Sequence, residues 1–394
     1  MRRVHIVLFL VIAVTATVGA QVDRLETYQE NFSASNLQTK LEIVRAADGE
    51  DAASFGPFYG QTLRFVVSNA EDLDTERALR EIALESIDRI EEGQYTAAVG
   101  DLWRLFTLYS DSTTRIRILE VIGEIGAERP EETGYLADWV ATQNNLRSGG
   151  GDVDLQVLTT AVDTLGKLQM PVAFEPILDV ILTQYPDSVT NQARESLSEI
   201  EGVPLELASD VIRSKDVPDK GSAFLFFMED DDYLSDSDKL ELALVTLNEA
   251  LRAQPATTRE RETLRQLRFT AANRIREGSY EPATNAVIRH FNETVLEFDR
   301  GQIPKNRVLE AIATLGAMGN EEAAARLTDY LELLNTYTER DRPYDTQILL
   351  ATIRNLEILD DPDSYNALFM TTILENYPDR VRDAAREAAD TVSQ

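Results

Sequence analysis

The sequence predicts an all-α fold, a right-handed α-solenoid of about nine stacked helical hairpins. First, apolar residues recur four and three positions apart, the spacing that places side chains on one face of an α-helix. Second, this pattern returns at intervals of 35 to 41 residues, about the length of one helical hairpin, apart from one interval of 115 residues that corresponds to about three units. Third, the chain of 394 residues is long for a single compact core, yet no change of composition divides it.

The pattern is clearest between Arg115 and Gly126, where Ile118, Ile122 and Ile125 mark the apolar face. We expect Gly126 to end this helix with a positive φ, because glycine takes that conformation without steric cost. The equivalent last apolar positions of the other copies are Ile90, Leu165, Ile200, Leu315, Leu356 and Val392.

Residues 1–20 resemble a secretory signal peptide. Arg2 and Arg3 precede an apolar run, and small residues stand before a cleavage point after Ala20. We therefore expect an exported protein, either periplasmic or extracellular. No later stretch is apolar enough to span a membrane, so we expect no membrane insertion.

Residues 21–56 are predicted to be an N-terminal cap and linker. Asn36 is placed to cap a short helix, because its side chain can accept from the free N–H groups of the first turn. The small and acidic stretch 46–54 is predicted as a linker, and Pro57 is predicted to open the next helix.

Residues 57–202 are predicted to form helical hairpins, with a turn at 110–112 that starts one of the second helices. A match 192 positions apart supports the repeats: residues 181–195 and 373–387 are identical at nine of fifteen positions and share Tyr-Pro-Asp. Residues 203–303 show weaker patterning and are predicted to be degenerate helical repeats, with helices at 240–251 and 260–276. Residues 304–394 are predicted to return to clear repeats and to end in a C-terminal cap.

The segment Asp379–Ala388 resembles the turn aspartate, the Val-Arg pair and the alanine-rich second helix of the HEAT-repeat family. The Leu-Gly pairs that begin at Leu165 and Leu315 resemble the family's helix end. The resemblance covers 57–202 and 304–392. It implies an α-solenoid in which the second helices line the concave face.

The composition limits the kinds of partner. The chain has 69 acidic and 38 basic residues, a net charge of −31, which disfavours nucleic acid and anionic lipid surfaces. A basic protein or peptide is the compatible partner. The chain contains no cysteine, so disulfides and cysteine-based metal sites are excluded.

Three segments could support chemistry. His290 is predicted to be a partly exposed helical residue beside Phe291 without a catalytic role. The acidic stretch 230–238 is predicted to be an interhelical loop in which Ser235 and Asp236 cap the next helix, with a calcium site as the alternative. The apolar stretch 224–228 is predicted to be a core helix, with an exposed binding patch as the alternative.

The predicted function is non-enzymatic protein binding or scaffolding in the cell envelope or outside the cell. Five glutamates hold one position in five copies and are the predicted partner-binding residues: Glu85, Glu120, Glu195, Glu310 and Glu387. No catalytic, cofactor-binding or metal-binding residue is assigned. The alternative is a hydrolase of cell-envelope glycan that uses paired carboxylates, for which the Glu-Ser pairs at 85–86 and 195–196 give a superficial resemblance to transglycosylases.

Overall fold

The computed structural model describes residues 24–127, 129–229, 233–340, 342 and 345–393. Within these residues every regular element is a helix and there is no strand, so the all-α prediction is confirmed. The chain divides between Gly202 and Val203 into two compact units. The signal-peptide prediction for residues 1–20 lies outside the described residues.

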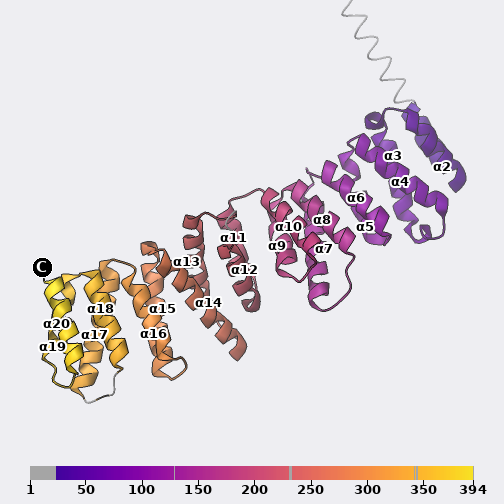
Figure 1. The fold of residues 1–394 in the computed structure, drawn as a ribbon. Coiled ribbons are helices and arrows are strands. Elements are labelled where there is room, and N and C mark those ends of the chain that lie inside the picture. Colours follow the sequence, from indigo (N-terminus) through magenta and orange to yellow (C-terminus); the bar gives the residue numbers. More distant parts are fainter. Residues whose placement is uncertain (1–23, 128, 230–232, 341, 343–344, 394) are drawn as a thin grey trace, which may run out of the picture. The chain divides into compact units, whose positions relative to one another are not determined.

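The first unit is a stack of helical hairpins (Figure 1). After helical residues 24–34 come α2 (Leu37–Ala46), α3 (Ala52–Ser68), α4 (Arg77–Glu92), α5 (Val99–Leu108), α6 (Ser112–Ile125), α7 (Pro130–Ser148), α8 (Leu155–Leu168), α9 (Phe174–Leu182) and α10 (Asp187–Glu199). From α3 onward, each odd-numbered helix packs against the helix that follows it. The even-numbered helices also pack in series from α2 to α10, and α3, α5, α7 and α9 form a second layer.

The second unit repeats this arrangement. Its helices are α11 (Pro204–Ser214), α12 (Val217–Glu229), α13 (Asp236–Arg252), α14 (Thr258–Glu277), α15 (Thr284–Asp299), α16 (Lys305–Gly316), α17 (Glu321–Glu339), α18 (Thr346–Leu359), α19 (Tyr365–Ile373) and α20 (Asp379–Val392). Packing again runs from neighbour to neighbour in an even layer and an odd layer. The helices predicted at 240–251 and 260–276 are confirmed as parts of α13 and α14.

The amphipathic faces predicted from the sequence form the core. Ile118, Ile122 and Ile125 are all buried on α6. Asp111 starts this helix as predicted, since its carboxylate accepts from the backbone N–H of Thr114 at 2.8 Å. Asn36 caps α2 in the same way, with 3.0 Å to the N–H of Thr39.

Buried polar contacts show that the two units are copies of each other. Lys40 in the first unit and Lys220 in the second are both buried, and each ammonium donates to backbone carbonyls seven and eight residues earlier. The buried Asn144 donates to the carbonyl of Pro176 at 3.0 Å. Its equivalent Asn335 donates to Ala367 at 3.1 Å. The match between 181–195 and 373–387 is therefore one part of a duplication of the whole unit.

The turns of the two units match as well. Gln94 after α4 and Ser279 after α14 both have positive φ, at 49° and 45°. Gln169 ends α8 and Asp360 ends α18, both in the left-handed conformation. These positions differ in residue type but keep the backbone conformation, so the turn geometry is set by the packing of the helices it joins.

One helix start differs from the prediction. The helix that Pro57 was expected to open begins five residues earlier, at Ala52 of α3, and part of the predicted linker is therefore helical. Asp51 is the cap, because its carboxylate accepts from the N–H of Ser54 at 3.0 Å. Pro57 lies inside the helix and removes one backbone hydrogen bond. The fully buried Phe58 and Tyr59 hold the helix in place.

Gly126 is the C-cap of α6 as predicted, but the positive φ predicted for it is wrong, because its φ is −91° and its backbone is right-handed. Glycine at the equivalent positions serves close packing instead. A Cβ on Gly166 of α8 would lie 2.8 Å from the Cβ of Ser196 and 2.9 Å from its Cα. The absence of a side chain therefore lets α8 and α10 approach each other.

Candidate functional site

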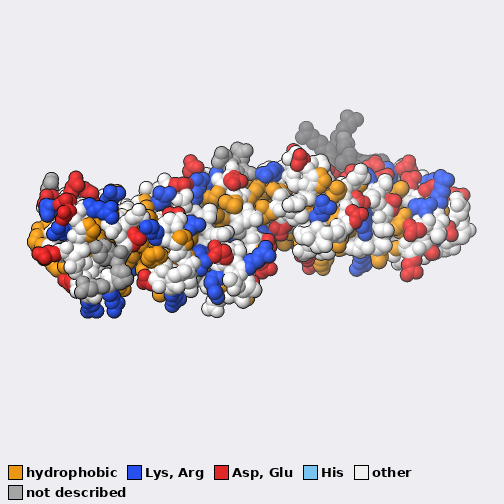
Figure 2. Space-filling view, turned by 60° about the horizontal axis from the view of Figure 1, so that its bottom comes forward, with side chains coloured by type: hydrophobic (Ala, Val, Ile, Leu, Met, Phe, Trp, Pro, Cys, Tyr) orange, Lys and Arg blue, Asp and Glu red, His pale blue; other side chains and the backbone are white. Residues whose placement is uncertain are grey.

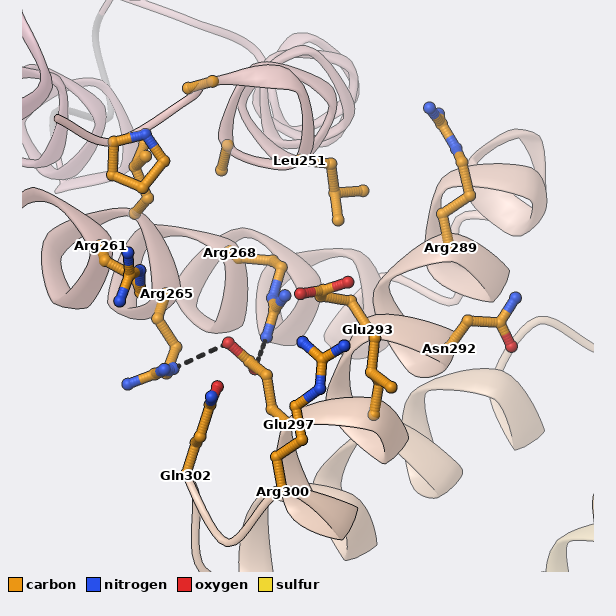
Figure 3. A pocket seen from close by; sticks show the side chains of 15 residues that line it. Leu251, Arg261, Arg265, Arg268, Arg289, Asn292, Glu293, Glu297, Arg300 and Gln302 are labelled. Atoms are coloured by element: carbon orange, nitrogen blue, oxygen red, sulfur yellow. Dashed lines mark hydrogen bonds and ion pairs between the residues drawn. The ribbon is translucent and has the colours of Figure 1, made fainter.

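The second unit contains a cavity of about 790 Å³ lined by the end of α13, the first half of α14 and the second half of α15 (Figure 3). Five arginines and two glutamates supply its charged lining, and we call this site the arginine pocket. Its charged residues are Arg261, Arg265, Arg268, Arg289, Glu293, Glu297 and Arg300. Such a surplus of positive charge is unusual in a chain whose net charge is −31.

The floor of the arginine pocket is a buried ion-pair cluster. Oε1 of Glu297 accepts from Nε of Arg265 at 3.0 Å, and Oε2 pairs with Nη2 of Arg268. The side chains of Glu297 and Arg268 are only 8% and 6% exposed. Burial lowers the pKa of Arg265, but its hydrogen bond to Glu297 and the charges of Glu297 and Glu262 more than offset this, so the pKa is raised. The Nε of Arg268 is buried and has no hydrogen-bond partner among the described residues.

Exposed arginines form the rim of the pocket. Arg289 donates through Nη2 to Oδ1 of Asn248 at 2.5 Å. No residue in the described part of the chain forms a hydrogen bond or ion pair with the side chains of Arg261 and Arg300. These two guanidinium groups keep all their donors free for water or a ligand.

An apolar wall faces the arginines. Leu251 and Pro255 come from the end of α13 and the turn after it, and Figure 3 shows Leu251 pointing toward the arginines. Leu264 and Leu296 add apolar surface from α14 and α15, and Leu296 is 42% exposed. The pocket therefore offers both charge and apolar surface to one ligand.

The local sequence explains how the arginines converge. Thr257 caps α14 by accepting from the N–H of Glu260 at 3.1 Å, and Glu260 accepts in return from the N–H of Ala256 at 2.7 Å. These two bonds fix the first turn of the helix. Arg261, Arg265 and Arg268 then follow at spacings of four and three, which places them on one face.

The first unit lacks the elements that build this pocket. The helix α14 has 20 residues and its counterpart α4 has 16. The helix α15 has 16 residues and its counterpart α5 has 10. When the ends of α4 and α14 are aligned, Glu76 and Ala83 stand where Arg261 and Arg268 stand. The extra turns thus provide the rim at Arg261 and the floor at Glu297.

The arginine pocket was not predicted from the sequence. The helix at 260–276 was predicted from its apolar spacing alone, while the arginine spacing on the same helix was the available signal. That signal shows one basic face. It does not show that the face meets the last turns of α15.

The five predicted glutamates lie on α4, α6, α10, α16 and α20, always the second helix of a hairpin. Glu85 is half-buried and the other four are exposed. Arg117 pairs with Glu120 at 3.3 Å, and Arg307 pairs with Glu310 at 2.8 Å. These pairs partly neutralise the row. Its binding to a basic partner stays a prediction.

His290 is fully buried, so the prediction of a partly exposed side chain is wrong. Its ring packs edge-on against Phe269 with centroids 4.8 Å apart, and neither ring nitrogen has a hydrogen-bond partner among the described residues. Burial, together with the charges of Arg268 and Arg307, lowers the pKa of His290 well below its usual value. The neutral ring acts as a core residue of α15.

The acidic stretch 230–238 is only partly described, because residues 230–232 lie outside the described residues. Ser235 caps α13 as predicted, and its hydroxyl accepts from the N–H of Asp238 at 3.2 Å. The described residues contain no group of three or more acidic or histidine side chains that could hold a metal ion.

The apolar stretch 224–228 belongs to α12 and is buried apart from Leu225, so the core-helix interpretation is confirmed.

The serines of the two Glu-Ser pairs are buried between helices. Ser86 bonds to Thr62 at 2.6 Å. Ser196 lies beneath Gly166. The hydrolase alternative stays a prediction, without an assigned carboxylate pair.

In the parts of the chain that the structure describes, no helix combines the length and apolar composition needed to cross a membrane.

Comparison with known proteins finds no matching protein-family model and no matching curated protein. Among solved structures, a chain from "Computational Design of Self-Assembling Cyclic Protein Homooligomers" is similar at 13% identity with a TM-score of 0.11. The similarity covers 87% of this chain and 93% of that chain. The resemblance to HEAT repeats therefore stays a prediction.

Proposed function

We propose that this protein is a non-enzymatic binding protein that takes up an acidic ligand in the arginine pocket of its second unit. The observation that supports the proposal is the convergence of five guanidinium groups on one cavity, opposed by only two carboxylates. Arginine presents donors in a planar fork that matches carboxylate and phosphate oxygens, and such charge-assisted bonds are stronger than neutral ones.

The state of the arginines favours ligand binding over a purely structural role. A structural cluster would pair its cations internally, as Arg265 and Arg268 do with Glu297. Arg261 and Arg300 have no such partner among the described residues. On the face shown in Figure 2, acidic and basic side chains are interspersed over the surface. Five guanidinium groups lining one cavity are a local concentration of donors, in contrast to this mixed surface.

The wider role that fits this site is that of an exported, HEAT-like scaffold. Stacked hairpins expose much surface for their length, which suits recognition of a partner. The glutamate row, if it binds a basic segment, would give the scaffold a second contact of opposite charge. A glycan hydrolase is the less supported alternative, because the described cavity with the most charged residues is lined by guanidinium groups.

Titration calorimetry with citrate, a compact tricarboxylate, tests the proposal. We expect binding that weakens as salt rises, because screening reduces attraction between exposed charges. The double variant Arg261→Gln/Arg300→Gln should bind at least tenfold more weakly. The matched control is Arg259→Gln, since Arg259 is an exposed residue of α14 that does not line the cavity. Equal affinity in the double variant and the control, or no binding by the wild type, would overturn the proposal.

A further inference from the structure

We infer that the ligand of the arginine pocket is an amphipathic carboxylate, a carboxylate group joined to an apolar group; the inference rests on the proposed function. Two features of the pocket support it, one for each half of the ligand. The arginine cluster recognises the carboxylate, and the leucines of α13, α14 and α15 that line the cavity take the apolar group.

The carboxylate half follows from Glu297. Its carboxylate already lies between Arg265 and Arg268 and uses one oxygen for each of them. The pocket thus contains a bound carboxylate from its own chain. The donors left over and open to the cavity are the exposed rim guanidinium groups of Arg261 and Arg300, which have no partner among the described residues. A second carboxylate can enter beside Glu297 and use these donors without displacing it.

The apolar half follows from the leucines that line the same pocket. Leu251, Leu264 and Leu296 line the same cavity as the arginines, and Leu296 leaves 42% of its surface exposed. A small hydrophilic anion such as phosphate would leave this wall in contact with water. A ligand with an alkyl or aromatic group would bury it, and burial of apolar surface is favourable.

The net charge of the protein disfavours large anions. Nucleic acid and anionic membranes present many phosphates, which a chain of net charge −31 repels. Near the pocket, Glu293 lines the cavity, and Glu260 and Glu262 flank the rim residue Arg261 in the sequence. A ligand with one or two charges meets little of this repulsion. The cavity of about 790 Å³ is in the range of small-molecule sites, which also fits a compact ligand.

Two sources could supply this chemistry, a free aliphatic acid or the C-terminus of a peptide that ends in an apolar residue. Calorimetry with octanoate, acetate and acetyl-Ala-Leu-Leu, the last as free acid and as C-terminal amide, separates them. We expect octanoate or the peptide acid to bind at least tenfold more tightly than acetate, and the amide to lose binding. If octanoate binds more tightly than the peptide acid, the ligand is a free aliphatic acid; if the peptide acid binds more tightly, the ligand is a peptide C-terminus.

Variants test the two halves separately. Arg261→Gln/Arg300→Gln should weaken octanoate and citrate alike. Leu296→Ser should weaken octanoate about tenfold and leave citrate unchanged, because citrate has no alkyl group for the wall. Leu225→Ser is the control, since Leu225 is exposed on α12 and does not line the cavity. Circular dichroism should show unchanged helix in each variant.

The outcomes separate the two ideas. If citrate binds through the arginines but octanoate and the peptide acid bind no better than acetate, the inference is overturned and the proposed function stands. If none of the probes binds, both are overturned. If Leu296→Ser and Leu225→Ser weaken octanoate equally, the apolar wall has no part in recognition and the inference is again overturned.

Discussion

The change of Glu297 to Ala should destabilise the second unit and make its stability depend on added carboxylate. Glu297 is 8% exposed and holds both floor arginines. Its removal leaves Arg268, which is 6% exposed, without its ion-pair partner. Arg265 keeps Glu262 as a partner and can reach water more easily.

The magnitude follows from this asymmetry. Loss of one partner from a buried ion pair costs about 3 to 5 kcal/mol, because the remaining charge stays buried. Since only Arg268 is left alone, we expect the lower end, about 3 kcal/mol. The control Glu293→Ala removes an exposed carboxylate one turn earlier on α15 and should change stability by no more than about 0.5 kcal/mol.

Urea denaturation with and without sodium acetate measures both effects. Acetate should return part of the loss in Glu297→Ala, about 1.4 kcal/mol at ten times its dissociation constant, because it binds only the folded chain. Sodium chloride at equal ionic strength controls for screening. If Glu297→Ala is as stable as Glu293→Ala, or if acetate and chloride act alike on it, the floor arginines do not form a carboxylate site.

Three further predictions concern packing, titration and processing. Gly166→Ala should lower the free energy of unfolding by about 1 to 3 kcal/mol, because the added Cβ would overlap Ser196. Gly134→Ala should instead raise it by about 0.5 to 1 kcal/mol, because no neighbouring atom lies within 4 Å of the added Cβ on α7. Urea denaturation midpoints of the two variants show whether their stability changes have opposite signs. The pKa of His290 is lowered in the folded protein, so the unfolded chain binds this proton more readily. The free energy of unfolding should therefore fall as the pH drops below about 6.5, by up to about 1.4 kcal/mol per pH unit. In His290→Phe this part of the pH dependence should be absent between about pH 6.5 and 5, as urea denaturation at each pH would show. Mass spectrometry of protein from its native host should find a chain that begins at Gln21, and an intact Met1 would contradict the predicted export.

Much of the fold could be predicted because amphipathic spacing and capping are local properties. Ile118, Ile122 and Ile125 needed only helical periodicity to be assigned to one buried face. The start of α6 at Asp111 could be predicted because a short polar side chain in that position caps the first turn. The start of α3 failed on the same local scale, because Asp51 and Pro57 are both start signals and the sequence does not say which of them prevails.

The features that could not be predicted depend on distances between helices. Gly166 and Gly126 look alike in the sequence, yet a Cβ on Gly166 would meet Ser196 of the neighbouring helix, whereas a Cβ on Gly126 would first meet the carbonyl oxygen of Ile122 in its own helix. The arginine pocket depends on the basic face of α14 meeting the last turns of α15, and on both helices being longer than their counterparts. Neither condition can be predicted from the sequence of one helix alone.

The duplication also has an evolutionary meaning. Two copies with the same order of helices and the same buried lysine and asparagine contacts share one inherited scaffold, while only one copy has the lengthened helices of the pocket. Selection on the shared scaffold could then act separately from diversification of the binding surface. If the proposed ligand binds the pocket, transplanting the longer α14 and α15 into the first copy should give the chain two such sites, with avidity set by the spacing of the ligands.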